Sequence, residues 1–126
     1  MAYKLLLADD EPDIVTILKR YLELDGYEVT IAHDGQEALA VIAVQRFDLI
    51  ILDVMMPKIN GWEVCKKIKT NPATRAIPVI ILTAKSQDVD ALMSYEIGAD
   101  EYATKPFEFP VLSNAIKRLL GSVHGA

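Results

Sequence analysis

Short, fully apolar runs alternate along this chain with segments in which apolar residues recur every three or four positions. Residues 5–8, 49–52 and 79–82 are apolar throughout. Strands that are buried on both faces of a parallel sheet have this composition. Residues 28–32 alternate between polar and apolar and predict an edge strand, whereas residues 101–103 are a weaker candidate for a fifth strand.

The segments between these strands have the apolar spacing of helices, and capping residues indicate where several of the helices begin or end. Pro12 lies in the first turn of the first helix and Gly26 follows its end. Asp34, with Glu37 three residues later, predicts the start of a second helix that runs to about residue 44, and Gly98 ends the fourth. In four of the predicted helices the apolar residues fall on one face. They are Ile14, Ile17, Leu18, Tyr21 and Leu22 in the first helix, Val64, Cys65 and Ile68 in the third, Val89, Leu92, Met93 and Ile97 in the fourth, and Leu112, Ala115, Ile116 and Leu119 in the fifth.

A strand followed by a helix, five times over, predicts an α/β fold. Such a repeat forms an open parallel sheet with helices on both faces and right-handed crossovers. At this length we expect the flavodoxin-like (βα)5 doubly wound sheet with strand order 2-1-3-4-5. The 126 residues predict one domain over 1–126, with a core over about 4–120 and a tail or linker start at 121–126.

Composition narrows the class of protein further. The formal net charge of −5 argues against direct binding of nucleic acid, which needs a basic surface. The sequence contains no apolar run long enough for membrane insertion and no signal-peptide pattern. A single cysteine, Cys65, rules out an internal disulfide and favours a cytoplasmic protein, with Cys65 as a small core residue.

Polar residues follow four of the predicted strands at the point where each strand ends. Open α/β sheets bind ligands outside the carboxyl ends of their strands, near the place where the strand order reverses. The residues are Asp9, Asp10 and Glu11 after the first strand, Asp53 after the third, Thr83 after the fourth and Lys105 after the fifth. The first and third strands are neighbours where the predicted order reverses, so we expect Asp9, Asp10 and Asp53 to converge, with Thr83 and Lys105 beside them.

This convergence predicts a cation site that also handles a phosphoryl group. Two carboxylates about 5 Å apart repel by roughly 3 kcal/mol at an effective dielectric constant near 20. Clustered oxygen ligands without histidine or cysteine favour Mg²⁺ (or Mn²⁺) over zinc or copper. A carboxylate such as Asp53 can act as a nucleophile and form an aspartyl-phosphate. Lys105 and the cation would neutralise phosphoryl oxygens, and Thr83 offers them a hydroxyl.

At these residues the chain resembles the receiver domains of response regulators, from Lys4 to about Leu120. No single motif carries the resemblance, but their order and spacing together are specific. The matching motifs are Asp9-Asp10-Glu11, Asp53-Val54-Met55-Met56-Pro57 with Gly61, Thr83-Ala84, Gly98-Ala99-Asp100-Glu101-Tyr102 and Lys105-Pro106-Phe107.

The resemblance implies a role for each site residue. Asp53 is implied to be the phosphoacceptor, and Thr83 and Lys105 to hold the phosphoryl group. Asp10, Asp53 and the backbone carbonyl of Met55 are implied to ligate Mg²⁺ directly, with Asp9 assisting through water. Tyr102 matches the aromatic residue that changes rotamer on activation.

The same resemblance implies the partners and the output. A sensor histidine kinase or a histidine phosphotransfer protein would supply the phosphoryl group. The surface of helix four, strand five and helix five would then change and control a target protein or a C-terminal output domain. A phosphorylation-dependent homodimer is a further expectation, weakened because Ala91 and Met93 stand where dimerising relatives carry arginines. The chain would be a signalling domain rather than an enzyme.

Two other functions fit parts of the pattern. An aspartate-nucleophile phosphatase of the haloacid dehalogenase type needs a second aspartate two residues after its nucleophile, and Met55 occupies that position. A flavodoxin needs a loop rich in serine, threonine and glycine after its first strand, and this loop is acidic.

Met55 also cannot orient an attacking water, so we expect slow self-dephosphorylation.

Overall fold

The computed structural model describes residues 2–84, 98–105 and 108–124. The predicted fourth helix around Val89–Ile97 and the residues Pro106 and Phe107 therefore lie outside the described residues. The described elements are β1 Lys4–Ala8, α1 Pro12–Leu24, β2 Glu28–Ala32, α2 Gly35–Val44, β3 Leu49–Asp53, α3 Gly61–Thr70, β4 Val79–Ala84, β5 Glu101–Lys105 and α5 Phe109–His124.

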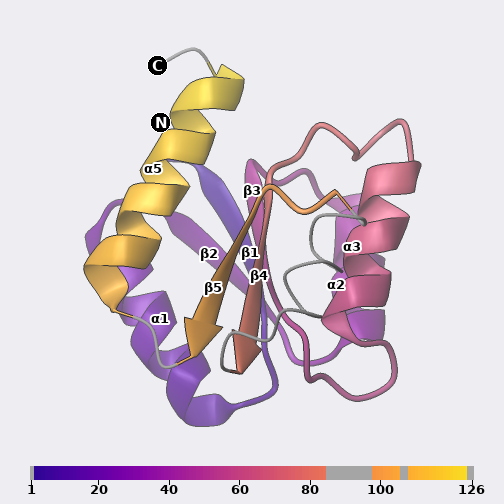
Figure 1. The fold of residues 1–126 in the computed structure, drawn as a ribbon, viewed down its shortest axis with the longest axis horizontal. Helices are drawn as coiled ribbons and strands as arrows, with labels where there is room; N and C mark the ends of the chain where they lie inside the picture. The colour runs from indigo at the N-terminus through magenta and orange to yellow at the C-terminus, as the bar shows by residue number, and fades with distance from the viewer. Residues whose placement is uncertain (1, 85–97, 106–107, 125–126) are drawn as a thin grey trace.

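The strands form one parallel sheet in the order β2-β1-β3-β4-β5, which confirms the predicted topology. Figure 1 shows α1 and α5 on one face of this sheet and α2 and α3 on the other. Strand order reverses between β1 and β3, so the carboxyl ends of these two strands lie side by side. None of the helices in the described part of the chain is long and apolar enough to cross a membrane.

Local capping explains where two of the helices begin. The Asp34 carboxylate accepts a hydrogen bond of 2.7 Å from the backbone N–H of Glu37, as the sequence predicted for α2. The Asn60 side chain accepts one of 3.0 Å from the N–H of Glu63 at the start of α3. Both caps fix helices whose first turns lie near the carboxyl ends of the strands.

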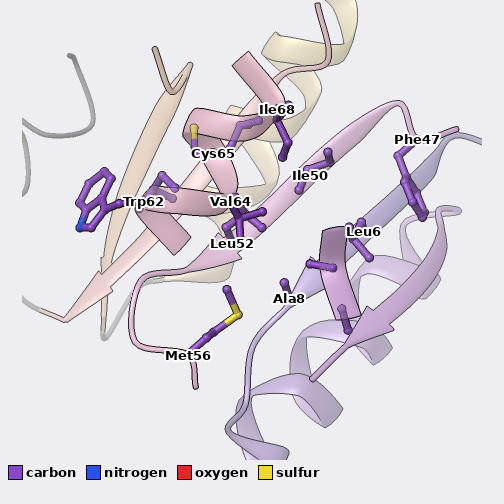
Figure 2. Close-up of a cluster of buried hydrophobic side chains, with 14 residues drawn as sticks. Leu6, Ala8, Phe47, Ile50, Leu52, Met56, Trp62, Val64, Cys65 and Ile68 are labelled. Atoms are coloured by element: carbon purple, nitrogen blue, oxygen red, sulfur yellow. The ribbon is translucent and has the colours of Figure 1, made fainter. Parts of the chain in front are cut away.

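The core consists of two clusters, one on each face of the sheet. Alternate residues of β1, β3 and β4 point to opposite faces, so each strand contributes to both clusters. Figure 2 shows the cluster beneath α2 and α3, where Val64, Cys65 and Ile68 pack against Ile50 and Leu52. Cys65 is a buried core residue, as predicted.

The apolar face of α1 is wider than the part of the helix that packs against the sheet. Leu18 and Leu22 are buried, whereas Ile17 and Tyr21, predicted on the same face, are 54% and 47% exposed. Each precedes a buried leucine by one residue, which places it about 100° around the helix, at the margin of the apolar face. The Tyr21 ring instead stacks on Phe109, with ring centroids 4.5 Å apart, and so links α1 to α5.

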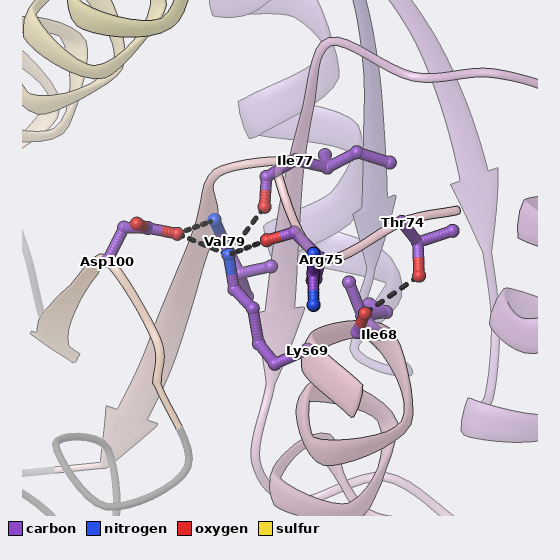
Figure 3. Close-up of polar contacts among 7 residues, drawn as sticks. All are labelled: Ile68, Lys69, Thr74, Arg75, Ile77, Val79 and Asp100. Carbon is purple, nitrogen blue, oxygen red and sulfur yellow. Dashed lines mark hydrogen bonds and ion pairs between the residues drawn. The ribbon is translucent and has the colours of Figure 1, made fainter. Parts of the chain in front are cut away.

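A lysine clamp joins α3 to the starts of β4 and β5, at the end of the sheet opposite Asp53 (Figure 3). The ammonium of Lys69 donates to the backbone carbonyls of Ile77 at 2.7 Å and Arg75 at 3.2 Å, and to the Asp100 carboxylate at 2.8 Å. The same Asp100 oxygen accepts a hydrogen bond of 2.8 Å from the N–H of Val79. All three Lys69 donors are therefore used.

Replacing Lys69 with methionine is expected to lower the free energy of unfolding by about 2 kcal/mol, because two carbonyls and a carboxylate lose a shared donor. Lys66→Met is the matched control, since Lys66 is an exposed lysine of the same helix. Urea unfolding followed by circular dichroism measures both variants. Equal midpoints would mean that the clamp does not stabilise the fold.

Candidate functional site

The predicted site residues converge at the carboxyl ends of the strands. Asp53 is the last residue of β3 and Asp9 directly follows β1; the last paired residues of these strands are Ala8 and Leu52. On the other side of β3, Thr83 lies near the end of β4 and Lys105 ends β5. This arrangement confirms the predicted convergence, which required only the strand order and the position of each residue relative to its strand.

Three aspartates form a compact cluster of oxygen donors. One carboxylate oxygen from each of Asp9, Asp10 and Asp53 lies within 4.8 Å of the others. Asp9 and Asp53 are buried, with exposed fractions of 0% and 2%, whereas Asp10 is exposed. The cluster therefore has a closed inner side and an open outer side.

Lys105 is the cation that contacts this cluster in the described part of the chain. Its ammonium lies 3.2 Å from Asp9 Oδ2, 3.3 Å from Asp53 Oδ1 and 2.9 Å from Glu11 Oε1. Asp9 is held further by the backbone N–H of Glu11, which donates to its Oδ1 at 3.0 Å. The contact with Glu11 was not predicted from the sequence; the only signal for it was the third acid in the run that follows β1.

Burial dominates the electrostatics of the central carboxylate. Desolvation, followed by the negative charge of Asp9, raises the pKa of Asp53 to about 6, although Lys105 and the N–H of Met55 act in the opposite direction. Burial also acts to lower the pKa of Lys105, but its hydrogen bond to Glu11 and the charges of Asp53 and Asp9 outweigh burial and raise it. The site thus holds more negative charge than its own lysine neutralises.

The cluster fits a divalent cation such as Mg²⁺. Among the described residues, Asp53 Oδ2 is a buried side-chain oxygen that has no hydrogen-bond partner. A buried charged oxygen without a partner is costly, and a metal ion would satisfy it. All the side-chain donors are carboxylate oxygens, which suit a hard cation.

Thr83 and Tyr102 share one face of the sheet. Thr83 is buried and follows the same alternation as Ile81, whose partner in β5 is Tyr102. Ile81 and Tyr102 both belong to the cluster packed under α3. A displacement of Thr83 would therefore change the packing on the face of the sheet that carries Tyr102.

The loop between β3 and α3 is packed tightly against the site. A side-chain carbon at Gly61 would lie 2.3 Å from the backbone oxygen of Asp53, so α3 can begin this close to β3 only with glycine at that position. The N–H of Gly61 donates to the carbonyl of Val54 at 3.1 Å. In the same loop Met55 is 72% exposed, and its thioether offers no acid or base to the cluster.

Comparison with known proteins identifies the relatives of this chain. The family model described as the response regulator receiver domain matches residues 5–117. The alkaline phosphatase synthesis transcriptional regulatory protein PhoP of Bacillus subtilis is 43% identical over 120 residues, which cover 95% of this chain and 49% of that protein. The transcriptional regulatory protein CpxR of Escherichia coli is 40% identical over 121 residues, 96% of this chain and 50% of that protein. The chain thus spans about half the length of these relatives.

Solved structures agree with the sequence comparisons. The signal receiver domain of a signal transduction histidine kinase from Syntrophus aciditrophicus superposes with a TM-score of 0.91 and 41% identity, covering 97% of this chain and 92% of that one. The receiver domain of the sensor histidine kinase PA1611 from Pseudomonas aeruginosa, solved with a magnesium ion coordinated in its active site cleft, has a TM-score of 0.88 and 30% identity, with coverage of 96% and 99%. With its sheet order, its acidic cluster and these matches, this chain belongs to the response regulator receiver domain family.

Proposed function

We propose that this domain is a phosphorylation-activated signalling switch in which Asp53 accepts the phosphoryl group. The observation that carries the proposal is the buried Asp53 carboxylate, which lies between two further aspartates and Lys105 and has one oxygen without a partner. A carboxylate oxygen of Asp53 attacks phosphorus, the new O–P bond forms, and the bond to the donor group breaks. Phosphoryl transfer of this kind depends chiefly on positioning and on charge neutralisation.

Each neighbouring residue has a part in this step. Asp10, Asp53 and the backbone carbonyl of Met55 would hold Mg²⁺ (or Mn²⁺), and Asp9 would assist through water. The bound cation supplies positive charge that offsets the carboxylates and the phosphoryl oxygens. Lys105 binds one phosphoryl oxygen, which its position 3.3 Å from Asp53 supports.

Thr83 and Tyr102 would convert the modification into a change of surface. Thr83 moves toward the phosphoryl group to donate a hydrogen bond, and Tyr102 on the neighbouring strand turns inward to fill the vacated space. This is a population shift between two packings of one core. A cavity of about 530 Å³ lies along β5 and α5, lined in part by Tyr102, Val111 and Arg118, so this surface has room to accept a partner. The helix-four part of the surface lies outside the described residues.

The family suggests the partners on either side of this switch. The phosphodonor would be a sensor histidine kinase or a histidine phosphotransfer protein. The switch would act on a target protein, on a second copy of this chain, or on a C-terminal output domain. PhoP and CpxR are about twice as long as the part that matches this chain, so they have room for such a domain. The domain itself would not bind nucleic acid, and it would act as a signalling domain that assists its own phosphorylation rather than as an enzyme with turnover.

A phosphatase of the haloacid dehalogenase type has less support. It requires an acid or base two residues after the nucleophile, and the exposed thioether of Met55 can serve as neither.

Incubation with acetyl phosphate and Mg²⁺ tests the proposal. Intact-mass analysis should detect one phosphoryl adduct on the wild type, none in the presence of EDTA, and none on Asp53→Asn. The control is Asp13→Asn, an exposed acid of α1 that should be modified like the wild type. An adduct that persists in Asp53→Asn would contradict the assignment of Asp53.

A further inference from the structure

The Lys105 ammonium is shared among three carboxylates that differ in their freedom to move. Asp9 and Asp53 are buried, and their contacts with Lys105 are 3.2 and 3.3 Å. Glu11 makes the shortest contact, 2.9 Å, although its side chain is 57% exposed. Lys105 itself is only 13% exposed, so of the two residues in this contact Glu11 is the one that faces water.

A lysine ammonium has three N–H donors, and here three carboxylates surround it. The ammonium donates hydrogen bonds to Asp9 and Glu11 and forms an ion pair with Asp53, so an incoming phosphoryl group competes with these carboxylates for it. The Asp9 carboxylate is fully buried, and its other oxygen accepts a hydrogen bond from the Glu11 N–H. If Asp9 lost its contact with Lys105, it would become a buried charge without a counter-ion, which is costly. Glu11 precedes α1 and its charge can move into water at little cost.

From these contacts we propose, on the basis of the function proposed above, that Glu11 is a positioning residue that competes with the phosphoryl group for Lys105. In the unphosphorylated domain Glu11 holds the ammonium on the outer side of the site. When a phosphodonor arrives, Glu11 must release Lys105 before the donor oxygens can bind it. Glu11 therefore slows phosphorylation and sets the sensitivity of the domain to its donor.

The charge of Glu11 acts in the same direction as its contact. Asp9, Asp10, Asp53 and Glu11 with Lys105 give the site a formal charge of −3, or −1 when a divalent cation is bound. A small phosphodonor is a dianion and is repelled by this field. Replacing Glu11 with glutamine removes one negative charge at the solvent side and weakens the hold on Lys105. We expect phosphorylation to become about threefold to tenfold faster, as the loss of one charge a few ångströms from the donor implies.

The test measures the rate of phosphorylation by acetyl phosphate at saturating Mg²⁺ for the wild type, Glu11→Gln and Asp13→Asn. Asp13→Asn removes the same charge from the first turn of α1, where no contact with Lys105 is present. A third variant, Glu11→Asp, keeps the charge but shortens the side chain that reaches Lys105. We expect the largest acceleration for Glu11→Gln, a smaller one for Glu11→Asp, and a rate close to wild type for Asp13→Asn.

A binding measurement separates this role from a merely structural one. Beryllofluoride is a non-covalent analogue of the phosphoryl group, and its binding can be measured by titration calorimetry or by the fluorescence of Trp62, the residue after Gly61. Glu11→Gln should bind beryllofluoride more tightly than the wild type at equal Mg²⁺. If it is phosphorylated no faster than Asp13→Asn, or binds beryllofluoride no more tightly, Glu11 does not compete for Lys105 although the proposed function stands. If the wild type is not phosphorylated at all, the proposed function fails and this inference fails with it.

Discussion

Gly35→Ala is expected to lower the free energy of unfolding by about 3 kcal/mol, at the upper end of the range for overpacked positions. A side-chain carbon at Gly35 would lie 1.9 Å from the backbone oxygen of Ile59 and 2.7 Å from its carbonyl carbon. Both contacts are with backbone atoms, so no side chain can turn aside to make room. The start of α2 and the loop between β3 and α3 would have to move apart.

Urea unfolding in the absence of metal measures this loss. Gln36→Ala is the matched control, because Gln36 is the next residue of α2 and is exposed. The displaced loop also carries Met55, so the alanine variant should respond less to Mg²⁺ than the control. A Gly35→Ala midpoint equal to that of Gln36→Ala would show that the two segments are not packed as described.

Asp53→Asn is expected to stabilise the metal-free domain at pH 7, by roughly 2 kcal/mol. Burial, and then the charge of Asp9, raises the pKa of Asp53 to about 6, and a shift of one pKa unit corresponds to about 1.4 kcal/mol. The loss of a counter-charge for Lys105 offsets part of the gain. Asparagine keeps the shape of the side chain while removing the charge that burial disfavours.

The sign of the pH dependence follows from the raised pKa. Between the ordinary aspartate pKa near 3.9 and about 6, the folded state binds more protons at Asp53 than the unfolded state. This contribution to stability is complete below the unfolded pKa and is lost as the pH rises through about 6. The advantage of Asp53→Asn over the wild type should therefore grow from pH 4 to pH 7 and then level off.

Urea unfolding in EDTA at several pH values checks this expectation, with Asp13→Asn as the control for general charge. Mg²⁺ should reverse the order, because it binds the native wild type and stabilises it by mass action. An Asp53→Asn variant that is less stable than the wild type at pH 7 without metal would mean that the buried charge is satisfied by contacts other than those described.

The topology of the domain could be predicted from the sequence because its strongest signals are local. Runs such as residues 49–52 and the Asp34 cap depend on neighbours within a few residues, and the structure places both as expected. The convergence of the aspartates with Lys105 followed from topology alone, since carboxyl ends of parallel strands meet at one edge. The family resemblance then attached roles to residues that geometry had only brought together.

Contacts between distant segments could not be predicted in the same way. The Lys69 ammonium contacts the Asp100 carboxylate, 31 positions away, and two nearer backbone carbonyls, and the carbonyl contacts follow from no side-chain pattern. Ile17 and Tyr21 were assigned to the buried face of α1 because helical spacing does not tell how wide a strip the sheet covers. The hold of Glu11 on Lys105 depends on the direction of one side chain at the surface.

Locating the phosphoryl group on the chain tests the central proposal most directly. After incubation with acetyl phosphate and Mg²⁺, borohydride reduction converts an aspartyl-phosphate to homoserine, which survives proteolysis and can be assigned by tandem mass spectrometry. We expect homoserine at position 53 and unmodified aspartate at positions 9, 10 and 48. Homoserine at any of these three positions, with Asp53 unmodified, would contradict it.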